Sequence, residues 1–151
     1  MASPAHEPSS REEIESRIPH RAPMLLVDEI VEEDETSIVA RKTFREDEHF
    51  VQGHYPGNPI VPGVILCECG AQTGALFLAK RVGDAAGVPV LTRLSDARFK
   101  HIVRPGDTVE IQVRLDEQLQ NAFFMTAKLL VAGKTAVRFQ FACALADAES
   151  P

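Results

Sequence analysis

The sequence has few cysteines, no excess of basic residues and no long apolar run. There are three cysteines, Cys67, Cys69 and Cys143. This number is small and odd, which argues against a disulfide framework, so we expect buried thiols in a cytoplasmic protein. Lysine and arginine number 16 against 22 acidic residues, and the formal net charge of −6 argues against a general nucleic-acid-binding protein. The sequence shows neither a charged-then-apolar leader nor an apolar stretch of bilayer length, so we expect no membrane insertion.

The length and composition are typical of one globular domain. The chain has 151 residues, of which 44% are hydrophobic and 25% charged, so it can bury a sizeable core. Residues 1–9 are polar and contain proline, which predicts a disordered tail before a domain over residues 10–147. Ser10 and Glu13 have the spacing of a capping box, and they predict a short helix that ends near Arg17.

One apolar segment predicts a long buried helix over residues 62–81. Pro62 suits the first helical turn, the segment after it is apolar nearly all round, and Gly83 is placed to end the helix. Gly70 and Gly74 each destabilise the helix by about 1 kcal/mol relative to alanine. We therefore expect another backbone to pass close to the helix at these two glycines.

Alternation of apolar and polar residues predicts strands on both sides of this helix. No helical pattern separates the later strands, so we expect neighbouring strands to pair antiparallel. Residues 46–61 contain prolines and glycines and predict an ordered loop. The simplest fold is α+β, with one curved antiparallel sheet wrapped around the single long helix. The predicted strands cover residues 25–33, 36–44, 89–99, 109–115, 123–131 and 137–143.

Glu68 is the first candidate for a catalytic residue, because it is the only charged residue between Pro62 and Ala79. A carboxylate in an apolar helix is costly unless it is paired, hydrogen-bonded or protonated, and a protonated carboxyl group suits general acid catalysis. Gln72 lies four residues later on the same helix face, where it could orient this group. The alternative is a structural glutamate in a buried polar network or on an exposed stripe of the helix.

His54 is the second candidate, in the Gly-His-Tyr-Pro-Gly turn over residues 53–57. An imidazole titrates near neutral pH, so it can accept a proton without much help from its surroundings. The alternative is a histidine that only hydrogen-bonds the turn. His49, His54 and Glu68 do not have the spacing of a zinc site, so we expect no metal.

The start of the predicted helix is the third candidate. The first backbone N–H groups, at Gly63 and Val64, have no partner within the helix and carry partial positive charge. Such groups can hold a carbonyl oxygen as it becomes an enolate. The alternative is an ordinary Pro-Gly helix start.

Three separated segments carry a resemblance to a known family. They are I-P-H-R-A-P-M-L-L-V-D-E-I, H-Y-P-G-N-P-I-V-P-G-V-I-L-C-E-C-G-A-Q and D-A-R-F-K-H-I-V-R-P-G-D. The segments closely resemble the signature of the FabZ-type 3-hydroxyacyl-[acyl-carrier-protein] dehydratases, over about residues 12–146. The resemblance implies a hot-dog fold, a homodimer and larger assemblies such as a trimer of dimers. It also implies dehydration of 3-hydroxyacyl thioesters to trans-2-enoyl thioesters in fatty-acid or related biosynthesis, with no cofactor.

The resemblance assigns roles at the site. His54 matches the family's catalytic histidine, Glu68 its catalytic acid, and Gly63 the glycine whose N–H polarises the thioester carbonyl. Each active site would combine the histidine of one subunit with the glutamate of the other, and which of the two acts as the base stays open. Tyr55 and Gln72 are expected to support the site. Related dehydratases have a cis peptide after the histidine, so we expect a cis bond between His54 and Tyr55.

The implied partner is an acidic acyl carrier protein that delivers the substrate. The chain is acidic overall, so this partner needs a local basic rim. The alternative is a set of solvated surface charges that bind nothing. The candidates for the rim are Lys80, Arg81, Arg98, Lys100 and Arg104.

Departures from the family pattern predict a wider or differently gated acyl pocket. Val90 and Leu91 stand where aromatic residues are expected, Arg93 stands where small residues are usual, and Gly70 replaces a bulky side chain. Two other functions remain open beside dehydration. One is a different hot-dog enzyme, an acyl-thioester hydrolase or an enoyl-CoA hydratase, and the other is a non-catalytic acyl-binding subunit.

Overall fold

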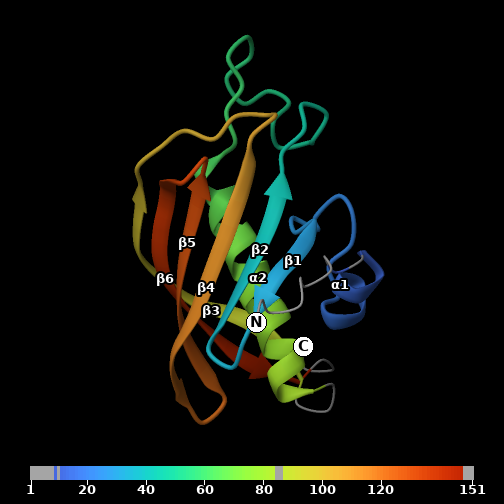
Figure 1. Ribbon diagram of the computed structural model, residues 1–151, viewed down its shortest axis with the longest axis vertical. Coiled ribbons are helices and arrows are strands. Elements are labelled where there is room, and N and C mark those ends of the chain that lie inside the picture. The colour runs from blue at the N-terminus through green and yellow to red at the C-terminus, as the bar shows by residue number, and fades with distance from the viewer. Residues whose placement is uncertain (1–8, 10, 84–86, 148–151) are drawn as a thin grey trace, which may run out of the picture.

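A long helix lies along the concave face of one curved sheet in the computed structural model, which describes residues 9, 11–83 and 87–147 (Figure 1). The sheet has six strands in the order β1-β2-β4-β5-β6-β3, and all neighbouring strands are antiparallel. This architecture confirms the predicted α+β hot-dog fold. The elements are α2 (Gly63–Val82), β1 (Glu29–Glu33), β2 (Ser37–Thr43), β3 (Val88–Phe99), β4 (Thr108–Leu119), β5 (Ala122–Val131) and β6 (Lys134–Ala146).

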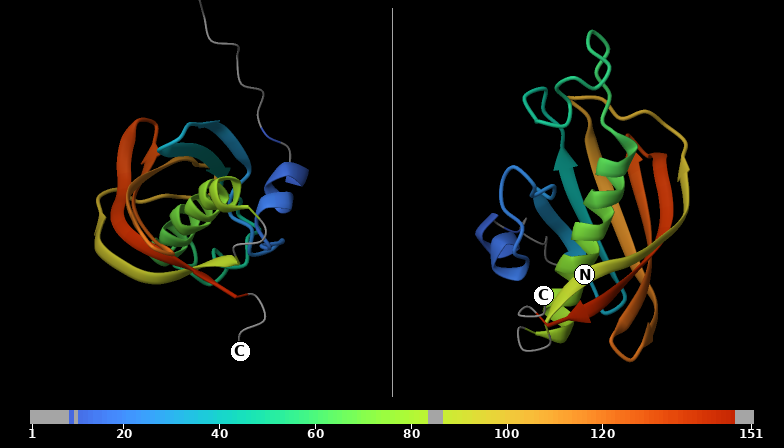
Figure 2. Two further views of the ribbon diagram at one scale, coloured as in Figure 1. Left: turned by 90° about the horizontal axis from the view of Figure 1, so that it is seen from below. Right: turned by 180° about the vertical axis from the view of Figure 1, so that it is seen from behind.

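Helix α1, Arg11–Arg17, packs outside the sheet beside β1 (Figure 2). It lies where a short helix was predicted, although Ser10 of the capping box and residues 1–8 of the predicted tail fall outside the described residues. Ser9, the last residue of the predicted tail, is buried, and its hydroxyl oxygen accepts a hydrogen bond of 2.7 Å from the N–H of Ile30. The packed part of the chain therefore includes Ser9.

The glycines of α2 let the helix lie close to the sheet. A Cβ at Gly70 would be 2.6 Å from Cζ of Phe139, and a Cβ at Gly74 would be 2.8 Å from Cζ of Phe141. The predicted approach of another backbone is wrong, because the atoms nearest these two glycines belong to side chains, above all the aromatic rings of β6. Gly83 ends the helix with φ 73°. Within the described ranges, no helix is long and apolar enough to cross a membrane.

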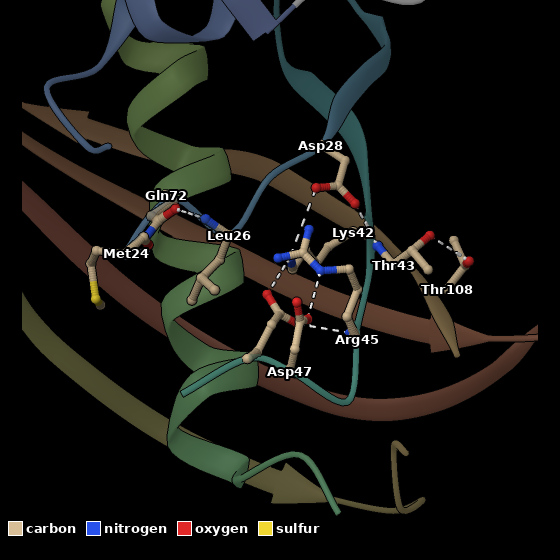
Figure 3. Close-up of polar contacts among 10 residues, drawn as sticks. Met24, Leu26, Asp28, Lys42, Thr43, Arg45, Asp47, Gln72 and Thr108 are labelled. Carbon is tan, nitrogen blue, oxygen red and sulfur yellow. Dashed lines mark hydrogen bonds and ion pairs between the residues drawn. The ribbon is translucent and has the colours of Figure 1, made fainter. Parts of the chain in front are cut away.

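The segment before β1 is tied to the helix at Met24 and Leu26, and it reaches the sheet only at Asp28, whose N–H donates to the carbonyl oxygen of Arg41 over 2.8 Å. The strand predicted from residue 25 begins only at Glu29. The side-chain oxygen of Gln72 accepts a hydrogen bond of 2.8 Å from the N–H of Leu26, and its Nε2 donates to the carbonyl oxygen of Met24 over 2.8 Å (Figure 3). These bonds occupy backbone groups that strand pairing would need, and they fix the loop between α1 and β1 against α2.

Candidate active site

Glu68 lines a cavity of about 240 Å³ at one side of α2. The walls come from α2, from the start of β3, from the end of β6 and from the loop between α1 and β1. Four elements that are distant in the sequence therefore meet at this carboxyl group. The lining residues are His20, Glu68, Ala71, Gln72, Ala75, Pro89, Val90, Leu91 and Cys143.

The Glu68 carboxyl group is held by a neighbouring amide. Nε2 of Gln72 donates a hydrogen bond of 3.0 Å to Oε1 of Glu68, and Gln72 itself is buried. The two side chains therefore share one helix face, as predicted. The Glu68 side chain is 28% exposed in the single chain, which is less burial than the apolar sequence predicted. The reason is that Glu68 opens onto the cavity and not into the interface between helix and sheet.

His54 lies in the loop that precedes α2, and one nitrogen of its ring makes a hydrogen bond to the backbone. Nδ1 is 2.9 Å from the carbonyl oxygen of Ile60. Since a carbonyl oxygen only accepts hydrogen bonds, this contact places the imidazole proton on Nδ1 and leaves the lone pair of Nε2 able to take a proton. The ring of Tyr55 packs edge-on against the imidazole, with 4.9 Å between the ring centroids. The geometry suits a general base.

The peptide bond between His54 and Tyr55 is trans, so the predicted cis bond is wrong. Among the described residues, the only cis peptide bond joins Ala22 to Pro23. The chain turns after His54 through the left-handed conformation of Tyr55, with φ 57°, and of Gly57, with φ 85°. These positive φ angles reverse the backbone without a cis bond.

A buried ion pair anchors the loop that carries His54. Nζ of Lys42 on β2 is 2.6 Å from Oε1 of Glu48, and both side chains are almost inaccessible to solvent. Asp28 lies 3.8 Å from the same ammonium group (Figure 3). The N–H of Val51 donates to the carbonyl oxygen of Glu48 over 3.0 Å, and the N–H of His54 donates to that of Val51 over 3.1 Å. Two successive backbone hydrogen bonds therefore link the ion pair to His54.

The N-terminal end of α2 presents free backbone N–H groups. Among the described residues, no acceptor is bonded to the N–H of Gly63 or Val64. A Cβ at Gly63 would be 2.7 Å from Cε1 of Phe99, so the glycine lets this ring lie over the start of the helix. The N–H groups point out of the helix end. Glu68 projects from the side of the helix, about 7.5 Å further along the axis at 1.5 Å per residue.

Within one chain, the structure does not bring His54 and Glu68 to one cavity. His54 is not among the residues that line the cavity of Glu68. Its loop rises beyond the N-terminal end of α2 (Figure 1). In the described part of the chain, no group of three or more His, Cys, Asp or Glu side chains could hold a metal ion.

The five predicted docking residues are split between the two ends of α2, so a single basic rim within one chain is wrong. Lys80 and Arg81 lie in the last helical turn. The other three lie near Val103, whose carbonyl oxygen accepts a hydrogen bond from the N–H of Val61 just before the helix. A helix of 20 residues is about 30 Å long, which separates the two groups. The three residues near the helix start are Arg98, Lys100 and Arg104.

Two of the departures from the family pattern lie in the cavity wall. Val90 and Leu91 line the cavity of Glu68. Gly70 packs against Phe139 in the core instead. Arg93 lines a different pocket, on the other side of β3 and β6 from Glu68 and α2. Only the first two replacements therefore bear on the shape of the cavity.

Two further residues of the cavity, His20 and Cys143, were not among the predicted site residues. Nε2 of His20 lies 3.9 Å from Oε1 of Glu68. Its place in the I-P-H-R segment, one of the three family motifs, is a signal that could have pointed to it. Burial, and to a smaller extent the nearby Glu68 carboxylate, raises the pKa of the Cys143 thiol to about 11. This thiol is therefore neutral near pH 7 and a poor nucleophile.

Comparison with known protein sequences gives one consistent picture. A model of the FabA-like domain family matches residues 18–140. The 3-hydroxyacyl-[acyl-carrier-protein] dehydratase FabZ of Chloroflexus aggregans is 40% identical over 139 residues, which cover 91% of this chain and 96% of that protein. The FabZ dehydratase of Pseudothermotoga lettingae is 44% identical over 123 residues, which cover 82% of this chain and 86% of that protein.

Solved structures share the fold at low sequence identity. A chain of the dehydratase heterocomplex ApeI:P from Xenorhabdus doucetiae superimposes with a TM-score of 0.78 at 17% identity, covering 89% of this chain and 91% of that one. The PaaI protein of the Escherichia coli phenylacetic acid degradation operon gives a TM-score of 0.63 at 16% identity. The superposition covers 76% of this chain and 80% of that one. At such identities these two structures bear on the fold alone.

Proposed function

Because this chain belongs to the FabA-like family, we propose that it is a 3-hydroxyacyl-[acyl-carrier-protein] dehydratase. It removes water from the 3-hydroxyacyl thioester and leaves the trans-2-enoyl thioester. The observation that carries the proposal is the presence of two complementary proton-transfer groups, an imidazole with a free Nε2 at His54 and a carboxyl group held in a cavity at Glu68. General acid and base groups typically contribute about 10²–10⁴-fold each.

In the proposed reaction, Nε2 of His54 takes the proton from C2 of the substrate. The free N–H of Gly63 holds the thioester oxygen, which gains negative charge as this proton leaves. Glu68 gives its proton to the C3 hydroxyl, the C3–O bond breaks, and water departs. The electron pair left by the C2 proton forms the double bond between C2 and C3. Proton exchange with solvent then returns His54 to its neutral form and Glu68 to its acid form.

We propose that each active site forms between two copies of the chain. Strand β3 has 12 residues and is a free edge of the sheet, and such an edge pairs readily with a second strand. Its side chains Val90, Leu91 and Leu94 are between 41% and 47% exposed. Val90 and Leu91 also line the cavity of Glu68. A second copy that docks along β3 would therefore lie beside this cavity and could bring its own His54 to it.

The substrate carrier in this proposal is an acyl carrier protein, which is the carrier named for the related dehydratases. Of the predicted docking residues, Arg98, Lys100 and Arg104 form the group at the helix start, and the guanidinium group of Arg104 donates to Oδ1 of Asn58 in the loop of His54 over 2.7 Å. We place the docking of the acidic carrier there. The three free, buried cysteines fit a reducing compartment such as the cytoplasm.

Product analysis tests the proposed activity. The purified protein is incubated with a panel of 3-hydroxyacyl-carrier-protein thioesters of different chain lengths, and the products are identified by mass spectrometry. We expect the loss of one water with the thioester intact. Release of the free acid would instead show a hydrolase, and binding of the acyl chain without turnover would show a non-catalytic subunit.

A further inference from the structure

We infer that His20 is a positioning residue of this site, which acts by holding the carboxyl group of Glu68. The inference rests on the proposed function and adds a third side chain to the proton-transfer pair. His20 lines the cavity together with Glu68 and Gln72, and its Nε2 is 3.9 Å from Oε1 of Glu68. The imidazole comes from the loop that Gln72 ties to α2, so its place beside the carboxyl group is fixed by the fold.

The other ring nitrogen of His20 indicates which nitrogen carries the proton. Nδ1 is buried and has no hydrogen-bond partner in the described part of the chain. A proton on Nδ1 would be a buried donor without an acceptor, which is unfavourable. The neutral imidazole therefore carries its proton on Nε2, the nitrogen that faces Glu68.

Two donors then converge on a single oxygen of Glu68. Nε2 of Gln72 donates to Oε1 over 3.0 Å, and Nε2 of His20 approaches the same atom. No hydrogen bond joins Oε2 to another described residue. In the proposed mechanism, Oε2 is therefore the oxygen that carries the acidic proton and passes it to the C3 hydroxyl of the substrate.

The role of His20 follows from the charge that this transfer leaves behind. When Oε2 loses its proton, Glu68 becomes a carboxylate, and N–H groups already aimed at Oε1 stabilise it. The distance of 3.9 Å is too long for a direct hydrogen bond. Catalytic hydrogen bonds are commonly long without substrate and shorten in the substrate complex, and one water can bridge such a gap.

His20 can be changed without disturbing the loop that carries it. Gln72 holds Met24 and Leu26, and the guanidinium group of Arg21 donates to the carbonyl oxygens of Glu15 and Ile18. None of these bonds uses the His20 side chain. Substitution of His20 therefore tests its action on Glu68 more cleanly than substitution of Gln72 would.

The test compares three substitutions in the full chain with the carrier-bound substrate. His20→Ala should lower kcat by about 10- to 100-fold, with KM changed by no more than about threefold. In His20→Gln the amide nitrogen lies near the former position of Nε2, so this variant should recover kcat to within about fivefold of wild type. His20→Met has a similar length and no donor, so its kcat should be as low as that of His20→Ala. His101→Ala, at an exposed histidine, is the control.

Thermal unfolding of each variant separates misfolding from loss of function. If His20→Ala unfolds, the comparison of the glutamine and methionine variants still decides the question. Equal kcat for these two, or a wild-type kcat for His20→Ala, would overturn the role of His20 while leaving the proposed dehydratase intact. A wild-type protein that forms no enoyl product would instead overturn the proposed function, and the inference with it.

Discussion

Replacement of His54 by alanine or of Glu68 by glutamine should each lower kcat for dehydration by about 10²–10⁴-fold. His54→Ala removes the nitrogen that accepts the C2 proton. Glu68→Gln keeps the size of the side chain and removes the proton that the leaving hydroxyl needs. The enoyl thioester is measured by its ultraviolet absorbance as it forms from a 3-hydroxyacyl-carrier-protein substrate.

The exposed loop histidine provides the control for this pair. His49→Ala changes an exposed histidine of the same loop and should retain wild-type kcat. Thermal unfolding should show all three variants folded, because neither catalytic side chain belongs to the hydrophobic core. Near wild-type turnover by both His54→Ala and Glu68→Gln would sink the assignment of the proton-transfer groups.

Lys42→Met should destabilise the protein by about 3–5 kcal/mol, because it leaves the Glu48 carboxylate buried without its partner. Glu48→Leu should destabilise the protein less than Lys42→Met, since Asp28 remains 3.8 Å from the Lys42 ammonium group. The double variant, with Met at 42 and Leu at 48, should regain most of the stability lost by Lys42→Met, because it leaves no buried charge unpaired. The free energy of unfolding in urea measures all three effects.

The same variants report on the loop. Glu48 belongs to the series of backbone hydrogen bonds that leads to His54, so each single variant should also lower kcat when assayed well below its unfolding temperature. A loss below about 1 kcal/mol for Lys42→Met would contradict the anchoring role of the ion pair.

The elements that the sequence predicted correctly are those with a local signal. The apolar run after Pro62 and the alternation in the later strands each depend on neighbours within a few residues, and α2 and the six strands overlap the predicted ranges. The start of β1 differed because it depends on Gln72, which is 46 residues away from Leu26. A contact of that kind leaves no trace in the local periodicity.

The candidate site was only partly predictable from the sequence. Gln72 beside Glu68 followed from helix geometry, and the hydrogen bond between them is present. The cis bond after His54 was carried over from relatives, and the actual turn uses a positive φ angle that the sequence does not reveal. Lys42 did leave a signal that was not used, because the alternation in β2 places it on the inward face with Ile38 and Ala40.

The central claim is that His54 of one chain and Glu68 of another form one active site, and mixing inactive variants tests it. His54→Ala and Glu68→Gln are unfolded and refolded together, so that random pairing makes about half of the dimers mixed. One of the two sites in each mixed dimer then keeps both wild-type residues. We predict recovery of about a quarter of wild-type activity, since a quarter of all sites are intact. Activity no higher than the average of the two separate variants would contradict the shared site.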